Sequence, residues 1–181
     1  MDIRDLPNDA RQLLMRLNAP PRLVAHLSLV HDSAGEILEA LQACWPDLPI
    51  DRDAVLFGAA THDIGKVLHP AELVGPGNRH EQDGPALLEQ SGFPPDRSRF
   101  ARTHGTWNHE ANLAIEDYVV ALADTCWKGS RDITLESKLA SGIAELLGME
   151  AWEVFMALDE IVTGIADQAD ERLAWQRRAG G

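Results

Sequence analysis

The chain has too little positive charge and too little cysteine for several common classes of protein. Its 181 residues include 16 Lys and Arg against 29 Asp and Glu, which gives a formal net charge of −13. Proteins that coat nucleic acid or dock on anionic membranes need basic patches, so the charge balance argues against both classes. The two cysteines, Cys44 and Cys126, have no CxxC spacing and predict free thiols rather than a disulfide framework.

Long apolar runs are also absent. No stretch approaches the roughly 18 apolar residues that a membrane span needs, and residues 1–5 are polar and acidic, unlike a signal peptide. We therefore expect a cytoplasmic protein with no membrane partner. A content of 45% hydrophobic and 25% charged residues is typical of a globular chain that buries a core.

Proline is missing from the second half of the chain, because all ten prolines fall at or before Pro95. Apolar residues spaced by three and four predict a long helix after Pro20 and Pro21, over residues 23–41. A short helix that is apolar on all sides should begin at Asp51 or Asp53 and run to about residue 60. Further helices are expected at 80–90, 95–104, 110–128, 134–147 and 150–175.

The stretch 68–78 is rich in proline and glycine and predicts a loop. Gly92, Gly105, Gly129 and Gly148 stand where helix C-terminal caps are expected. No stretch alternates as a strand would. The predicted fold class is all-α, a single-domain helical bundle.

The most informative motif is His62-Asp63 in the sequence THDIGK, at the end of the short buried helix. An unpaired charge is costly in such a place, and a cation held by the imidazole and the carboxylate removes that cost. These ligand types suit Fe, Mn, Ni, Co or Zn rather than a thiolate site. A polar pair at a helix end, without metal, is the simpler alternative.

The order of histidines and aspartates resembles the HD superfamily of metal-dependent phosphohydrolases over residues 20–132. Its pattern of a histidine, a His-Asp doublet and a later aspartate is met by His26, His62-Asp63 and Asp124. The context HDIGK, followed by Pro70, is similar to the HDIG subgroup. His80, with Gly84 four residues later, and His104 stand where the two-metal branches carry extra ligands. The resemblance implies an HD-type bundle over 20–181, preceded by a helical extension over 1–19, with the helices from about 134 packing on the bundle.

The choice of the first histidine rests on this resemblance. His26 and His31 lie on opposite edges of one apolar helix face, so periodicity does not separate them. The family's pattern Arg-x-x-x-His-x-x-x-Val-x-x-x-Ala fits Arg22 and His26, with Val30 and Ala34 following. His31 is therefore interpreted as a surface or outer-layer histidine.

The resemblance also implies two divalent ions and a division of the ligands between them. His26, His62, Asp63 and Asp124 are assigned to one ion, and Asp63 bridges to a second ion held by His80 and His104. A metal-bound hydroxide then attacks phosphorus in a small phosphorylated substrate such as a nucleotide. Iron and manganese are the expected metals, with Ni, Co or Zn as alternatives.

Three cations are candidates for binding the substrate's phosphate. Lys66 and Lys128 each stand four residues after a predicted ligand, one helical turn away. Arg131 resembles an arginine that follows the last ligand in the diadenosine-tetraphosphate hydrolase branch, and its planar fork suits phosphate. Asp63 and Lys66 are the predicted catalytic residues.

Two other functions remain open on the sequence alone. The same six-ligand order occurs in HD-fold di-iron oxygenases, which act on polyols or organophosphonates. A non-catalytic HD interaction module is less consistent with the sequence, because all six candidate ligands are present. The oligomeric state is left open, with a homodimer as one option.

Overall fold

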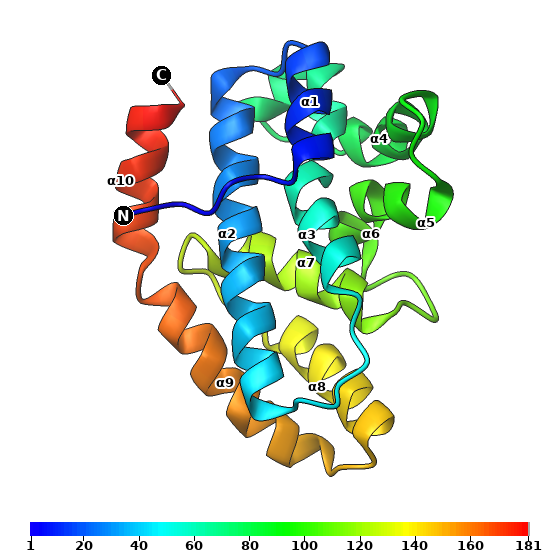
Figure 1. Cartoon of the computed structure of the whole chain (residues 1–181), viewed down its shortest axis with the longest axis vertical. Helices are drawn as coiled ribbons and strands as arrows, with labels where there is room; N and C mark the ends of the chain where they lie inside the picture. Colours follow the sequence, from blue (N-terminus) through cyan, green and yellow to red (C-terminus); the bar gives the residue numbers. More distant parts are fainter. Residues whose placement is uncertain (181) are drawn as a thin grey trace.

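The computed structural model describes residues 1–180, and each regular element in this range is helical (Figure 1). The α-helices are α1 (Asn8–Arg16), α2 (Pro21–Cys44), α3 (Arg52–Thr61), α4 (Arg79–Gln90), α5 (Pro95–Ser98), α6 (Phe100–Thr106), α7 (Ile115–Cys126), α8 (Ile133–Leu147), α9 (Ala151–Ala166) and α10 (Ala169–Ala179). Two short 3₁₀ helices, η1 (Ile64–Val67) and η2 (Pro70–Leu73), follow α3. The predicted all-α fold is confirmed. None of the helices described over residues 1–180 combines the length and apolar character that crossing a membrane requires.

Local sequence signals set most of the helix ends. Pro21 stands in the first turn of α2, where its missing N–H is no loss. The Asp51 side chain accepts a hydrogen bond from the Ala54 amide and caps α3, which selects Asp51 over Asp53 as the cap. Asp132 caps α8 in the same way, through the amides of Thr134 and Leu135.

Three of the four predicted glycine caps are confirmed. Gly92, Gly129 and Gly148 have φ angles of 95°, 83° and 66°, which glycine adopts without strain. Gly105 is not a cap, because it lies within α6. A Cβ at Gly105 would overlap the carboxylate of Glu81, so the glycine makes room for a side chain from α4.

Some predicted boundaries are wrong. The helix expected at 110–128 begins only at Ile115, because Glu110 is held by Arg102 and Thr106 while Asn112 takes a left-handed conformation. The helix expected at 95–104 is two pieces, α5 and α6. Part of the predicted loop at 68–78 forms η2.

The helix expected at 150–175 is divided into α9 and α10. The segment between them contains neither proline nor glycine, so the sequence carried no break signal. The turn is stabilised from within α10, where the buried guanidinium of Arg172 donates to the carbonyl of Ile165 at 2.8 Å. This turn redirects α10 so that it runs beside α2 (Figure 1).

Two apolar clusters form the core, and α3 contributes to both. The larger one joins α2, α7, α8 and α9, and it contains Val55 and Ala59 of α3. The smaller one joins the first turns of α2 with α1, α4 and α6. It also contains Phe57 and Ala60 of α3. Because α3 is apolar on both sides, its C-terminal His62 and Asp63 emerge in the middle of the molecule, where they are 0% and 2% exposed.

Candidate metal centre

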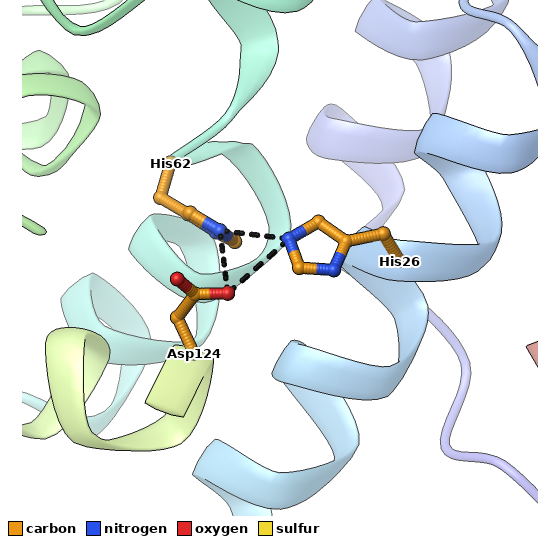
Figure 2. A group of neighbouring side chains, drawn as sticks. All are labelled: His26, His62 and Asp124. Carbon is orange, nitrogen blue, oxygen red and sulfur yellow. Dashed lines mark hydrogen bonds and ion pairs between the residues drawn. The ribbon is translucent and has the colours of Figure 1, made fainter. Parts of the chain in front are cut away.

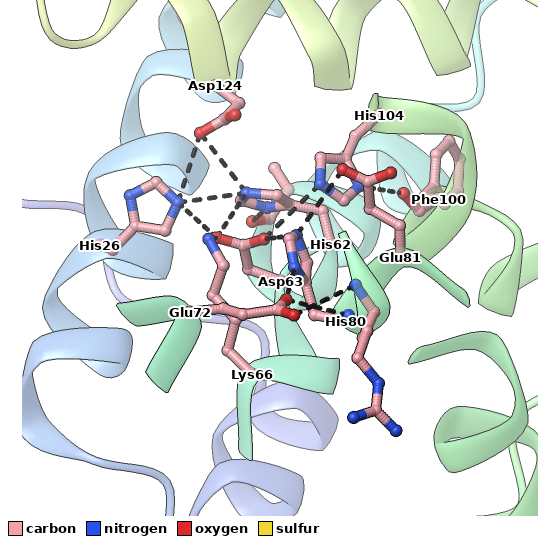
Figure 3. A network of polar contacts seen from close by, with 12 residues as sticks. His26, His62, Asp63, Lys66, Glu72, His80, Glu81, Phe100, His104 and Asp124 are labelled. Atoms are coloured by element: carbon pink, nitrogen blue, oxygen red, sulfur yellow. Dashed lines mark hydrogen bonds and ion pairs between the residues drawn. The ribbon is translucent and has the colours of Figure 1, made fainter. Parts of the chain in front are cut away.

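The His62-Asp63 doublet lies where α3 gives way to η1. The backbone N–H of His62 still donates to the Gly58 carbonyl, while Asp63 leaves the α-helical path with φ −96° and ψ 12°. This change of direction brings the imidazole and the carboxylate to one buried cluster instead of to successive faces of a helix. The four other predicted ligands reach the same cluster from α2, α4, α6 and α7 (Figure 3).

A first group of potential ligands consists of His26, His62 and Asp124 (Figure 2). The Nε2 atoms of the two histidines are 3.2 Å apart, and Asp124 Oδ1 lies 3.3 Å from His26 Nε2 and 3.5 Å from His62 Nε2. Asp124 Oδ1 is buried, yet within the described residues no donor has hydrogen-bond geometry to it. Three potential ligand atoms therefore face one another, which is an arrangement that a cation stabilises.

A second group of potential ligands surrounds one carboxylate oxygen of Asp63, Oδ1 (Figure 3). Asp63 Oδ1 lies 3.0 Å from His80 Nε2 and 3.5 Å from His104 Nε2. Asp63 Oδ2 points to the first group, 3.1 Å from His26 Nε2 and 3.7 Å from His62 Nε2. The carboxylate thus presents one oxygen to each group.

Hydrogen bonds on the far side of the imidazoles determine which nitrogen is free. Nδ1 of His62 lies 2.9 Å from the Ala59 carbonyl, and Nδ1 of His104 lies 3.0 Å from the Phe100 carbonyl. A carbonyl only accepts, so each Nδ1 carries the proton and each Nε2 keeps its lone pair toward the cluster. This is the orientation that metal-binding histidines need.

Two glycines bring α4 close enough to place His80. A Cβ at Gly65 in η1 would overlap the carbonyl of His80, and a Cβ at Gly84 would come within 2.9 Å of the Ala101 side chain. Gly65, the glycine of the HDIGK motif, therefore lets η1 pack directly on the backbone of α4. Gly84 in turn lets α4 pack on α6, which carries His104.

Sequence reasoning missed two acidic residues at the cluster. Glu81 groups with His80 and His104 as a third potential ligand of the second group. Glu72 on η2 accepts a hydrogen bond from His80 Nδ1 at 2.6 Å and also accepts from the amides of Arg79 and His80. Glu81 could have been found by its position next to His80. Glu72 stands in a stretch that was read as a loop, so no sequence signal pointed to it.

Without a cation, burial and the neighbouring charges act in opposite directions on the pKa values of the cluster residues. Burial lowers the pKa of His62. Burial also works against a protonated His26, but the neighbouring carboxylates of Asp124 and Asp63 outweigh it and raise the pKa of His26 to about 9. Burial works against ionised Asp63 and Asp124, yet the surrounding histidines hold the pKa of both carboxyls well below the usual range. In the metal-free protein one proton on His26 therefore partly replaces a cation.

The predicted phosphate-binding residues are placed differently from one another. Lys66 Nζ lies 2.5 Å from Asp63 Oδ2, at the edge of the first group. Lys128 lines the same cleft as Lys66, His26 and Asp63, a hollow of about 330 Å³. The structure does not bring Arg131 to the cleft.

Arg131 has a different set of partners. Its guanidinium pairs with the fully buried Glu136 at 2.5 Å and with Asp159 at 2.6 Å, and it donates to the Thr163 hydroxyl at 2.8 Å. Sequence order alone did not show that α8 and α9 would supply these acceptors. The position of Arg131 is explained by compensation of a buried carboxylate, so the geometry gives no support to a phosphate-binding role.

Neither the alternative histidine nor a larger hollow elsewhere belongs to this centre. His31 is buried, 2% exposed, so its interpretation as a surface residue is wrong, and burial lowers its pKa to about 4. A hollow of about 720 Å³ near Asp51 and Arg97 contains none of the six predicted ligands. The smaller cleft, by contrast, is lined by two of the predicted ligands, His26 and Asp63, and by Lys66 and Lys128.

Comparison with known proteins agrees with this centre. The family model described as HD domain matches residues 23–127, which include all six predicted ligands. No curated protein and no solved structure matches the chain. A match over more than half of the chain, together with the buried His-Asp groups, shows that the chain belongs to the HD domain family.

Proposed function

We propose that the protein is a metal-dependent phosphohydrolase with two adjacent divalent ions and a small phosphorylated substrate. The observation that carries the proposal is the carboxylate of Asp63. Its two oxygens face two separate groups of histidines, at 3.1 Å from His26 and 3.0 Å from His80. A carboxylate between two ligand groups is the arrangement that a two-metal hydrolytic site requires.

The residues divide into two ligand sets. His26, His62 and Asp124 would hold one ion, and His80 and His104, joined by Glu81, would hold the other. Asp63 would be shared between them. Imidazole and carboxylate ligands without thiolate favour Fe or Mn, with Ni, Co and Zn as alternatives. Bound there, such ions supply Lewis acidity and lower the pKa of water to about 7.

The chain's own groups complete the catalytic arrangement. Lys66 holds Asp63 Oδ2 and keeps two further N–H donors for a phosphoryl oxygen. Lys128 at the cleft offers a second ammonium. In the hydrolysis, a water oxygen bonds to phosphorus, the ester or anhydride P–O bond breaks, and the departing oxygen takes a proton. Lys66 favours the transition state because its ammonium lies beside the negatively charged phosphoryl oxygens.

The test combines metal analysis with a substrate panel. We expect about two ions per chain and hydrolysis of phosphomonoesters, phosphodiesters or nucleotide anhydrides. Asp63→Asn should reduce the affinity for both ions, whereas His104→Ala should reduce the affinity for one. His69→Ala is the matched control, because His69 pairs with Asp83 rather than with the cluster residues.

Several outcomes would contradict the proposal. Retention of both ions in the His80→Ala and His104→Ala variants would remove these histidines from the centre. Consumption of O₂ with a polyol or an organophosphonate, and no phosphate release from the panel, would identify an HD-fold oxygenase instead. If the His62→Ala and Asp63→Ala variants keep both metal and function, the protein is a non-catalytic module.

A further inference from the structure

The cleft above the metal centre is closed on one side by α10, which lies outside the part of the chain that the family model matches. A Cβ on Gly129 would come within 3.0 Å of Ala169, at the start of α10. A Cβ on Gly180, just after α10, would come within 3.2 Å of the Arg22 backbone. The helix therefore extends from the end of α7 to the beginning of α2, next to the two elements that carry Asp124 and His26.

A buried arginine holds α10 in this position. Arg172 is 0% exposed, and its guanidinium donates to Glu36 of α2 at 2.7 Å and to the Ile165 carbonyl of α9 at 2.8 Å. Leu173, the next residue, and Gln176, one turn later, line the cleft. The wall that these residues form is fixed by an ion pair rather than left to fray as a chain terminus.

Two cations at this cleft have no acidic partner among residues 1–180. Within residues 1–180, no carboxylate lies within 4.0 Å of the charged groups of Arg22 or Lys128, whereas Lys66 is paired with Asp63. Arg22 stands four residues before His26, and Lys128 four residues after Asp124. Arg22 is thus about one helical turn, roughly 6 Å of rise, from His26, and Lys128 lies in the turn that directly follows α7. In a chain of net charge −13, two unpaired cations beside one cleft indicate an anionic ligand.

A third donor belongs to the same cleft. Trp127 lines it and is 4% exposed, and its indole ring meets the His26 ring edge-on at 5.5 Å between centroids. The buried Nε1 of Trp127 finds no acceptor among the described residues. A buried N–H without an acceptor carries an energetic penalty that a ligand oxygen would remove. The outer part of the cleft therefore offers a guanidinium and an ammonium, and the buried indole N–H of Trp127 belongs to a residue that lines it.

We propose that this outer subsite, formed by Arg22, Lys128 and Trp127 against α10, binds a second phosphoryl group of the substrate. This inference rests on the proposed function, since it places the reacting phosphoryl group at the metal centre. It specifies the substrate class as a small molecule with two phosphoryl groups, either a phosphoanhydride or a bisphosphate. The planar fork of Arg22 suits the oxygens of a phosphate, and the apolar Leu73 and Leu173 border the remainder of a cleft of about 330 Å³.

The test measures binding of three probes to the metal-loaded protein by calorimetry. Methylenediphosphonate carries two phosphoryl groups and resists hydrolysis, orthophosphate carries one, and malonate carries two carboxylates. The double substitution Arg22→Gln with Lys128→Gln should weaken methylenediphosphonate binding by at least about tenfold, the loss expected for two charge-assisted contacts. Orthophosphate binding should change less than about twofold. Trp127→Phe keeps the ring, removes the N–H and should weaken the diphosphonate by severalfold.

Matched controls and opposing outcomes keep the test decisive. Lys138→Gln removes a half-buried cation and Arg178→Gln an exposed one, and neither residue lines the cleft, so binding of each probe should remain at the wild-type value. An equal loss for orthophosphate and diphosphonate, or no loss for either, would overturn the inference. Tighter binding of malonate than of diphosphonate would replace phosphate by carboxylate as the second group and would also overturn it.

The same measurements separate this inference from the proposed function. If the protein binds its ions and discriminates between the probes but releases no phosphate from any ester or anhydride, the subsite stands and the hydrolase proposal fails. If it hydrolyses monophosphates and bisphosphates and the double variant raises the KM of both alike, the hydrolase proposal stands and the subsite fails.

Discussion

Removing the carboxylate of Glu72 should weaken the binding of one metal ion and leave the binding of the other unchanged. Glu72 contacts only one imidazole of the centre, through the 2.6 Å hydrogen bond from His80 Nδ1. This bond fixes the proton on Nδ1 and turns Nε2 toward Asp63 Oδ1, 3.0 Å away. Such outer carboxylates typically contribute a factor of about 10–100 in metal affinity. Glu72→Ala should therefore lower the affinity for the second ion by about that factor and change the affinity for the first ion by less than about twofold.

Metal titration of chelator-stripped protein measures this directly. Calorimetry with Mn²⁺ should show two binding steps in the wild type and a selective loss of the one that involves His80 in Glu72→Ala. Glu72→Gln keeps an acceptor for His80 Nδ1 but removes the negative charge, so its affinity should lie between those of the wild type and the alanine variant.

A second carboxylate–imidazole pair provides the control. Asp83 Oδ2 lies 2.6 Å from His69 Nε2, the same separation as in the pair of Glu72 and His80. Asp83→Ala should leave both binding steps unchanged, because His69 is not among the grouped ligands. If Glu72→Ala binds both ions as the wild type does, or if it weakens both equally, Glu72 does not act through His80.

Three further outcomes are expected. Because the pKa of His26 is raised to about 9 in the metal-free protein, metal binding at pH 7.5 should release about one proton, and the apparent metal affinity should rise with pH until about pH 9. The part of metal-free stability that is due to His26 should be lost between about pH 6.5 and pH 9. Calorimetry in buffers of different ionisation enthalpy counts the released protons, and a count of zero contradicts the assignment. Gly65→Ala should lower the free energy of unfolding in urea by at least about 2 kcal/mol through overlap with the His80 carbonyl, whereas Gly164→Ala, with open space around it in α9, should lower it little or raise it. Arg172→Ala should release α10 and expose the chain after residue 166 to limited proteolysis, and an unchanged cleavage pattern would show that other contacts hold the helix.

The sequence predicted the helices wherever the apolar pattern and a cap agreed. The buried character of α3 was visible in its run of apolar residues, and its start was limited to Asp51 or Asp53, of which the structure selects Asp51. The turn between α9 and α10 was invisible, because Arg172 determines it through contacts with residues far away in the sequence. A charged residue in a polar helix gave no indication that it would be fully buried.

The candidate site shows the same division between local and long-range information. The motif and the order of the residues selected six side chains that the structure brings into one cluster. They did not select Glu72, because its role depends on how η2 folds back over α4. The family resemblance assigned phosphate to Arg131, and it could not show that the buried Glu136 of α8 and the half-exposed Asp159 of α9 pair with its guanidinium.

The cluster draws its side chains from elements spread over most of the chain, from His26 on α2 to Asp124 on α7. An ion held by both of these residues would act as a cross-link that closes a loop of about 100 residues, comparable in entropic terms with a long-range disulfide. Because α3, α4 and α6 attach at the same point, loss of the ions would loosen several helices together. The rate at which a chelator loosens these helices, followed by amide hydrogen exchange, should then match the dissociation rate of the ions, so the metal centre sets how long this part of the fold stays closed.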